Sequence, residues 1–162
     1  LVRELPAAAP AEPFACRARA ATGRAYKKER SYDRAAAMLR PVAAACADPE
    51  VRVRSLYLLA SAASIAGDRS EAVRLYRRLA REYPAHPYAD DALFFAADLL
   101  ARLGRVDEAR EALAALVLGH PAGDYRDEAR FRLAWRARRG DQLGPLGLGD
   151  DAVAVPVTKV GR

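Results

Sequence analysis

Side chains that could act in acid–base catalysis or bind a metal are few in this sequence. The histidines are His86 and His120, and Asp90 and Asp91 are paired acids four and five residues after His86. His86 lies in a proline-flanked loop, where we expect it to cap the next helix, and the two acids begin that helix, where its dipole favours negative charge. His120 falls on a predicted helix face, where we expect packing or capping. The sequence therefore predicts no catalytic residue and no metal site.

The two cysteines, Cys16 and Cys46, do not have the spacing of metal ligands. Cys46 falls on an apolar helix face, where a buried thiol can act as a small core residue. In an oxidising compartment the two can instead form a disulfide, which sequence spacing alone does not establish. Both interpretations stay open at this stage.

Cofactor and membrane signatures are also missing from the sequence. No glycine loop of the phosphate-binding type occurs, and the glycines at 140, 144, 147 and 149 instead indicate a flexible tail. No apolar run approaches the 18 residues or more of a membrane-spanning helix. We therefore expect no cofactor and no membrane span.

The chain is basic, with a formal net charge of +6 and 27 lysine and arginine residues. A basic helical repeat can bind nucleic acid, with an affinity that falls steeply with salt. Most of these basic residues, however, alternate with acids along predicted helices, which is typical of a solvated face. Nucleic acid is therefore kept as an alternative partner, behind a protein or peptide.

The sequence repeats itself at an offset of 37 residues. Ala35, Ala72 and Ala109 coincide at this offset, and apolar residues follow each of them at steps of 4, 3 and 4. These steps place the apolar residues on one face of an α-helix. The same stripe therefore occurs in three successive units.

The repeat and its punctuation predict seven helices. Their expected ranges are about 16–29, 32–46, 50–66, 69–82, 88–103, 106–119 and 124–139. Gly67 and Gly104 stand at helix ends, where glycine accepts a left-handed conformation. Asp48 followed by proline predicts a helix N-cap, and the spacing from Asp68 to Glu71 predicts a capping box. Short connections between the helices require antiparallel neighbours.

At these spacings the chain resembles the tetratricopeptide repeat. The clearest unit is formed by Leu93, Ala96, Ala97, Leu100, Gly104, Ala109, Leu113, Leu116 and Pro121. The resemblance implies an all-α fold of antiparallel helix pairs stacked in a right-handed superhelix, with about 3.5 repeats of period 37. We expect a repeat domain over 16–140, a disordered linker or cut end over 1–15 and a flexible tail over 141–162.

A narrower resemblance concerns the stretch from Leu79 to Phe95, together with Tyr32 to Ala35 and Leu39 to Pro41. These segments are similar to the helical, non-catalytic body of bacterial soluble lytic transglycosylases. That resemblance implies a periplasmic protein working near peptidoglycan, with glycan strands as a further possible ligand. Similar segments also occur in outer-membrane assembly lipoproteins and cell-division coordinators.

The same family cleaves glycan strands in a separate domain, with a catalytic glutamate that is usually followed by serine. This chain contains no Glu-Ser pair and no second region that predicts a sheet. We therefore expect this chain to be non-catalytic, whether it is a scaffold in its own right or the body of an enzyme whose catalytic domain lies elsewhere.

In tetratricopeptide stacks the first helix of each pair lines a concave face. The residues predicted to line it here are Arg54, Tyr57, Ser61, Phe94, Asp98, Phe131, Trp135 and Arg138. Tyr57, Phe94 and Phe131 recur at the 37-residue interval, so their rings can form a ladder that seats a peptide or a sugar strand. The alternative is that these rings only pack between adjacent units.

The pattern is interrupted after the seventh helix. At the next repeat interval, Leu146 takes the place of Ala109, and Pro145 opposes a helix. A natural array normally ends in a polar capping helix. We therefore expect the seventh helix, with Phe131 and Trp135, to be partly uncovered in the isolated chain.

Overall fold

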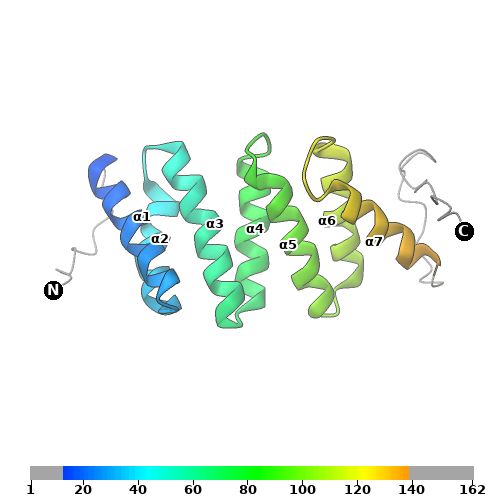
Figure 1. Ribbon diagram of the computed structural model, residues 1–162, viewed down its shortest axis with the longest axis horizontal. Coiled ribbons are helices and arrows are strands. Elements are labelled where there is room, and N and C mark those ends of the chain that lie inside the picture. The colour runs from blue at the N-terminus through cyan, green and yellow to red at the C-terminus, as the bar shows by residue number, and fades with distance from the viewer. Residues whose placement is uncertain (1–12, 139–162) are drawn as a thin grey trace, which may run out of the picture. The chain divides into compact units, whose positions relative to one another are not determined.

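The computed structural model describes residues 13–138, which contain seven α-helices and no strand. The helices are α1 (Pro13–Lys28), α2 (Tyr32–Ala45), α3 (Pro49–Ala66), α4 (Arg69–Glu82), α5 (Tyr88–Arg102), α6 (Val106–Gly119) and α7 (Arg126–Arg138) (Figure 1). Short turns join them, and the consecutive helices α1 and α2, α2 and α3, α5 and α6, and α6 and α7 pack together in antiparallel pairs. The predicted all-α repeat of helix pairs is therefore confirmed.

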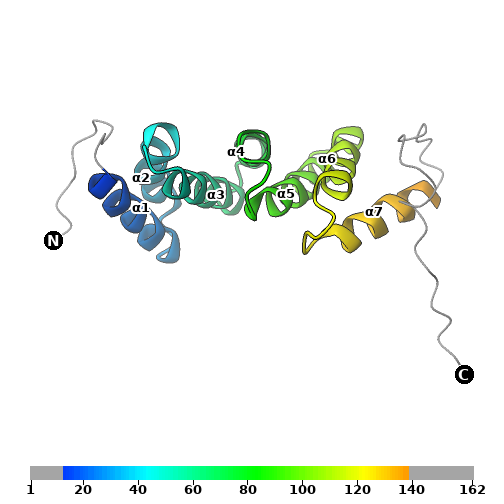
Figure 2. The same ribbon diagram turned by 90° about the horizontal axis from the view of Figure 1, so that it is seen from above.

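The chain divides into two compact units, residues 1–79 and 80–162, with the boundary inside α4. In the first unit α2 packs against both α1 and α3, and in the second α6 packs against both α5 and α7 (Figure 2). The predicted superhelix concerns both units together and stays a prediction. The predicted tail lies outside the described residues, as does the predicted linker apart from residues 13–15, which are helical.

Local signals fix the helix ends, which lie within three residues of the predicted ranges. One carboxylate oxygen of Asp48 accepts hydrogen bonds from the amides of Glu50 at 3.0 Å and Val51 at 3.2 Å, so the predicted N-cap of α3 is confirmed. The Asp68 carboxylate likewise accepts from the amide of Glu71 at 3.0 Å. Gly67 and Gly104 have φ of 93° and 75°, the left-handed conformation expected after a helix.

The core of the first unit depends on close contact between α1 and α2. Gly23 lies so near to α2 that a Cβ added to it would be 2.6 Å from Cγ of Leu39. Cys16 and Cys46 form a disulfide across the same pair, with their Cα atoms 5.9 Å apart, and both are buried beside Val42. The alternative left open by the sequence is therefore resolved in favour of the disulfide.

Two ion pairs join successive helix pairs in the first unit. Arg17 contacts Asp48 at 3.0 Å, and Arg40 contacts Glu71 at 3.0 Å. Hydrogen bonds from Arg17 and from the Val51 amide lower the pKa of Asp48. Burial raises the pKa of Glu71, but the hydrogen bonds from Arg74 and Arg40 outweigh it, so this pKa also lies below its ordinary value.

The second unit buries both small and large apolar side chains of α5 and α6. Ala89, Leu100, Ala109 and Leu116 are buried between these helices. A contact that the sequence did not indicate ties α5 to the α6–α7 turn, because the buried carboxylate of Asp90 accepts a hydrogen bond from the amide of Asp124 at 3.1 Å. The turn approaches so closely that a Cβ added at Gly123 would lie 2.6 Å from the Asp90 carboxylate, so a larger residue there would require the Asp90 side chain to shift.

Replacing Ala109 with arginine should destabilise the second unit severely. Ala109 is 1% exposed, so the larger side chain must displace α5 or α6 and place a charge in the core. We expect a loss of about 3 kcal/mol or more in the free energy of unfolding, measured by urea denaturation. Ala115→Arg, on the exposed face of the same helix, is the matched control. Equal unfolding midpoints for the two variants would show that the helix register is wrong.

The stability of the first unit should fall in acid because of Glu71. Its pKa is lowered on folding, so the unfolded chain takes up a proton first, and stability is lost as the pH falls below the ordinary value of 4.5. Glu71→Gln should flatten this part of the pH profile, whereas Glu111→Gln, at an exposed position, should not. Thermal unfolding followed by circular dichroism between about pH 3 and pH 7 measures the effect. An unchanged profile in Glu71→Gln would contradict it.

Candidate functional site

The predicted binding residues of the first unit lie on α3. Arg54 is exposed and forms an ion pair with Glu50, one turn earlier on the same helix. The half-buried ring of Tyr57 packs edge-on against Tyr76 of α4, with the ring centroids 5.9 Å apart. Ser61 is half-buried one turn further along. At this position the aromatic residue of the predicted ladder therefore packs against a neighbouring helix.

Phe94 occupies the equivalent position in the second unit and is enclosed. Its ring stacks on that of Tyr125, just before α7, with centroids 4.2 Å apart and planes 13° apart. The guanidinium of Arg132 lies 4.5 Å from the centre of the same ring, a cation–π contact. Only 7% of Phe94 remains exposed. The ring therefore acts as a packing element between α5 and α7.

Ion pairs extend this contact along both helices. Asp98 of α5 accepts from Arg102 at 2.7 Å and from Arg132 at 3.4 Å. Glu128 of α7 also binds Arg132, at 2.7 Å. Asp98, predicted to face a ligand, thus holds the arginine that covers Phe94. Neither Tyr125 nor Arg132 was among the predicted site residues, because nothing in the local sequence distinguishes them from other surface residues.

Phe131 and Trp135 of α7 present the aromatic surface that remains open. They are 50% and 49% exposed, and their rings lie 6.0 Å apart with planes at 28°. Their spacing of one helical turn makes a continuous aromatic patch on one face of α7. The side chain of Arg138, the last predicted binding residue, lies outside the described residues. The aromatic patch, defined as Phe131 and Trp135, is the clearest candidate contact surface in the second unit.

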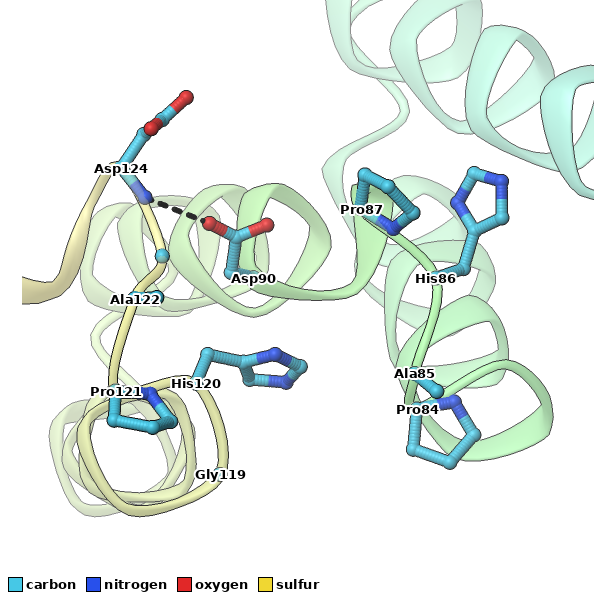
Figure 3. A pocket seen from close by; sticks show the side chains of 11 residues that line it. Pro84, Ala85, His86, Pro87, Asp90, Gly119, His120, Pro121, Ala122 and Asp124 are labelled. Atoms are coloured by element: carbon cyan, nitrogen blue, oxygen red, sulfur yellow. Dashed lines mark hydrogen bonds between the residues drawn. The ribbon is translucent and has the colours of Figure 1, made fainter.

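A concavity of about 420 Å³ lies between the turns that begin α5 and α7 (Figure 3). His86 and His120 come from different turns of its wall. The Nδ1 atom of His86 accepts from the amide of Tyr88 at 3.1 Å, so its predicted capping role is confirmed. The Asp90 carboxylate is occupied by the amide of Asp124. The side chains of His86 and Asp90 thus serve to shape the turns.

Residues 13–138 contain no cluster of three or more histidine, cysteine, aspartate or glutamate side chains placed to hold a metal ion. None of the helices in this part of the chain is long and apolar enough to cross a membrane. Among the described residues, the aromatic patch is therefore kept as a candidate surface for recognising another molecule.

Comparison with protein families identifies a match over residues 63–131 to the Tetratricopeptide repeat family. The matched segment runs from the end of α3 to the first half of α7. A comparison with curated protein sequences finds no match. The family match and the observed helix pairs together support a protein of the tetratricopeptide type with a tetratricopeptide-like helical repeat fold.

Trp135 is the single tryptophan of the chain, so its fluorescence reports on the aromatic patch. Because the ring is about half exposed, we expect an emission close to that of free tryptophan and efficient quenching by iodide in dilute protein. A blue shift should follow when a partner or a second copy covers α7. A blue-shifted, unquenched emission from the dilute monomer would show that the patch is already covered.

Proposed function

We propose that this chain is a non-catalytic scaffold that binds a protein or peptide partner in the bacterial cell envelope. The observation that carries the proposal is the exposed aromatic patch on a helical repeat of the tetratricopeptide type. Repeats of this type are protein-interaction modules. Aromatic side chains dominate the binding energy of many protein interfaces. A half-exposed aromatic pair on a rigid helix loses little conformational entropy on binding.

The packing of Phe94 supports a partner of this kind. Phe94 and Phe131 are one repeat apart, yet Phe94 is covered by Tyr125 and Arg132 whereas Phe131 is half exposed. Phe94 thus shows that an aromatic ring at this repeat position can pack against a second ring and a cation. A partner segment that supplies an apolar or aromatic side chain therefore fits the patch.

The disulfide supports an envelope location. Disulfides persist in oxidising compartments such as the periplasm and are rare in the cytosol. The Cys16–Cys46 bond encloses a loop of about the length for which a contribution of roughly 3–4 kcal/mol is expected. This agrees with the resemblance to the body of lytic transglycosylases, in which case the parent protein cleaves peptidoglycan with another domain. An outer-membrane assembly or cell-division coordinator is the alternative within the same compartment.

The ion-pair pattern favours a protein over a nucleic acid as the partner. Many arginines are already engaged with acids of the same or a neighbouring helix. They include Arg17, Arg40, Arg54, Arg74, Arg102, Arg105, Arg110 and Arg132. Such arginines would have to exchange these partners for phosphates, so the net charge overstates the attraction for nucleic acid.

Replacing both Phe131 and Trp135 with serine should weaken partner binding without unfolding the chain. We expect the immobilised wild-type protein to capture a partner from an envelope extract, and the double variant to bind that purified partner at least about 10-fold more weakly by calorimetry. Leu118→Ser is the matched control, because Leu118 is also an exposed apolar residue but lies on α6. Equal affinity in the double variant would refute the role of the patch.

The same wild-type protein, incubated with purified peptidoglycan, should release no soluble fragments. Turnover of peptidoglycan that one carboxylate substitution abolishes would refute the non-catalytic role. Affinity for DNA that exceeds affinity for every captured protein, and that falls steeply with salt, would favour the nucleic-acid alternative instead.

A further inference from the structure

A buried carboxylate in the second unit has no cation beside it. Asp90 is only 7% exposed, yet its side chain forms no ion pair with any residue in the described part of the chain. Its side chain accepts one hydrogen bond there, from the amide of Asp124 to the Oδ2 atom at 3.1 Å. Buried aspartates in proteins are nearly always paired with a cation or bound to a metal ion. Asp90 is therefore a negative charge that the described residues do not balance.

The second oxygen of this carboxylate, Oδ1, can be reached from outside the protein. Within residues 13–138 every fully buried side-chain oxygen or nitrogen that lacks a hydrogen-bond partner belongs to a serine or an arginine. Oδ1 of Asp90 also lacks a partner there, so it is not fully buried. Figure 3 shows this oxygen pointing away from Asp124, toward the turn that carries His86 and Pro87. A ligand can therefore contact it.

Asp90 lines the concavity of about 420 Å³ between the turns that begin α5 and α7. Prolines and alanines of both turns form much of the remaining wall, namely Pro84, Ala85, Pro87, Pro121 and Ala122. The lining residues include no lysine or arginine, although the chain as a whole has a net charge of +6. The concavity thus combines an apolar wall with an uncompensated carboxylate, so it favours a cation carried on an apolar stem.

The imidazole of His120 adds an acceptor to the same concavity. This side chain is half-buried, and its ring has no hydrogen-bond partner within residues 13–138. Figure 3 shows the ring projecting from its own turn toward the turn that carries Pro84 and Ala85. A neutral imidazole has one nitrogen that accepts a hydrogen bond. His120 can therefore hold a donor that enters between the two turns.

The arrangement favours an ammonium group over a guanidinium. A guanidinium binds a carboxylate best through two parallel hydrogen bonds, one to each oxygen. At Asp90 the amide of Asp124 already uses Oδ2, and Gly123 packs against the same oxygen, so a single oxygen is left for a ligand. An ammonium is a compact charge with three donors, and the four-carbon stem of lysine can lie along an apolar wall.

From these observations we propose that the concavity between the turns of α5 and α7 binds a lysine side chain of a partner protein. The ammonium pairs with Oδ1 of Asp90 and donates a hydrogen bond to His120, while the methylene groups of the stem contact the prolines. This inference rests on the protein-binding function proposed above. It adds a second contact for the partner, formed by residues other than those of the aromatic patch.

The test titrates the full chain at low salt with the blocked pentapeptide Ala-Gly-Lys-Gly-Ala and follows backbone chemical shifts by NMR. We expect shifts centred on residues 84–90 and 119–124. Replacing the lysine of the peptide with norleucine, which keeps the stem but has no charge, should abolish these shifts. Replacing it with arginine should weaken binding about 5-fold, because only one carboxylate oxygen is available.

Two asparagine variants separate the buried charge from charge in general. Asp90→Asn should lower the affinity for the lysine peptide about 10-fold, and the chain should stay folded because the side-chain amide oxygen can still accept from Asp124. Asp124→Asn is the matched control, because the exposed carboxylate of Asp124 points away from Asp90 (Figure 3). It removes the same charge and should change the affinity less than about 2-fold.

Two further substitutions test the acceptor. His120→Gln keeps an acceptor in the side chain, so this variant should bind the lysine peptide more tightly than His120→Ala. The double variant with serine at Phe131 and Trp135 should bind the peptide as the wild type does, because neither residue lines the concavity.

Equal binding of the lysine and norleucine peptides, or an unchanged affinity in Asp90→Asn, would refute the lysine site. If that happens while the Phe131 and Trp135 double variant still loses its captured partner, the scaffold function stands and only the lysine site is wrong. Failure of the wild-type chain to capture any partner would refute the scaffold function, and the lysine partner with it. Calcium or zinc ions that shift the same residues, where the lysine peptide does not, would overturn the lysine ligand in favour of a metal ion.

Discussion

Close contact between helices, made possible by very small side chains, is the constraint on which the rest of each unit depends. Ala35, Ala72 and Ala109 are 0%, 0% and 1% exposed, and Gly23 leaves no room for a Cβ against Leu39. Helices that approach this closely have little freedom to slide, because any larger atom would collide with the facing backbone or side chain. Each helix pair is therefore a rigid support, and the side chains around it can vary without changing the fold.

That variation at equivalent positions produces three different surfaces from one repeat. Phe94 is enclosed, Phe131 is half exposed, and Ala20 leaves an open pocket, although the three residues occupy corresponding places in the helix pairs. One backbone arrangement thus provides a packing contact, an aromatic patch and an open pocket between α1 and α3. The functional differences between the repeats lie in side-chain size, since the helices themselves are alike.

Most of the fold could be predicted from the sequence because its determinants are local. The N-cap at Asp48 and the left-handed Gly67 act within a few residues, and the apolar stripe repeats at a fixed interval. The candidate site was harder to predict, because Tyr125 and Arg132 lie 31 and 38 residues from the ring that they cover. The Asp90–Asp124 contact joins residues that are similarly far apart in the sequence, so it too becomes visible only once the helices are packed.

The disulfide has a mechanical consequence for the N-terminal helix pair. A pull on the chain before Cys16 would pass through the sulfur bridge directly to Cys46, so the 30-residue interval between them would bear no tension. That interval contains the rest of α1 and nearly all of α2, a stretch that could otherwise extend by roughly 100 Å. A covalent bond at this place would therefore keep the first helix pair folded under a force that pulls on the chain before Cys16.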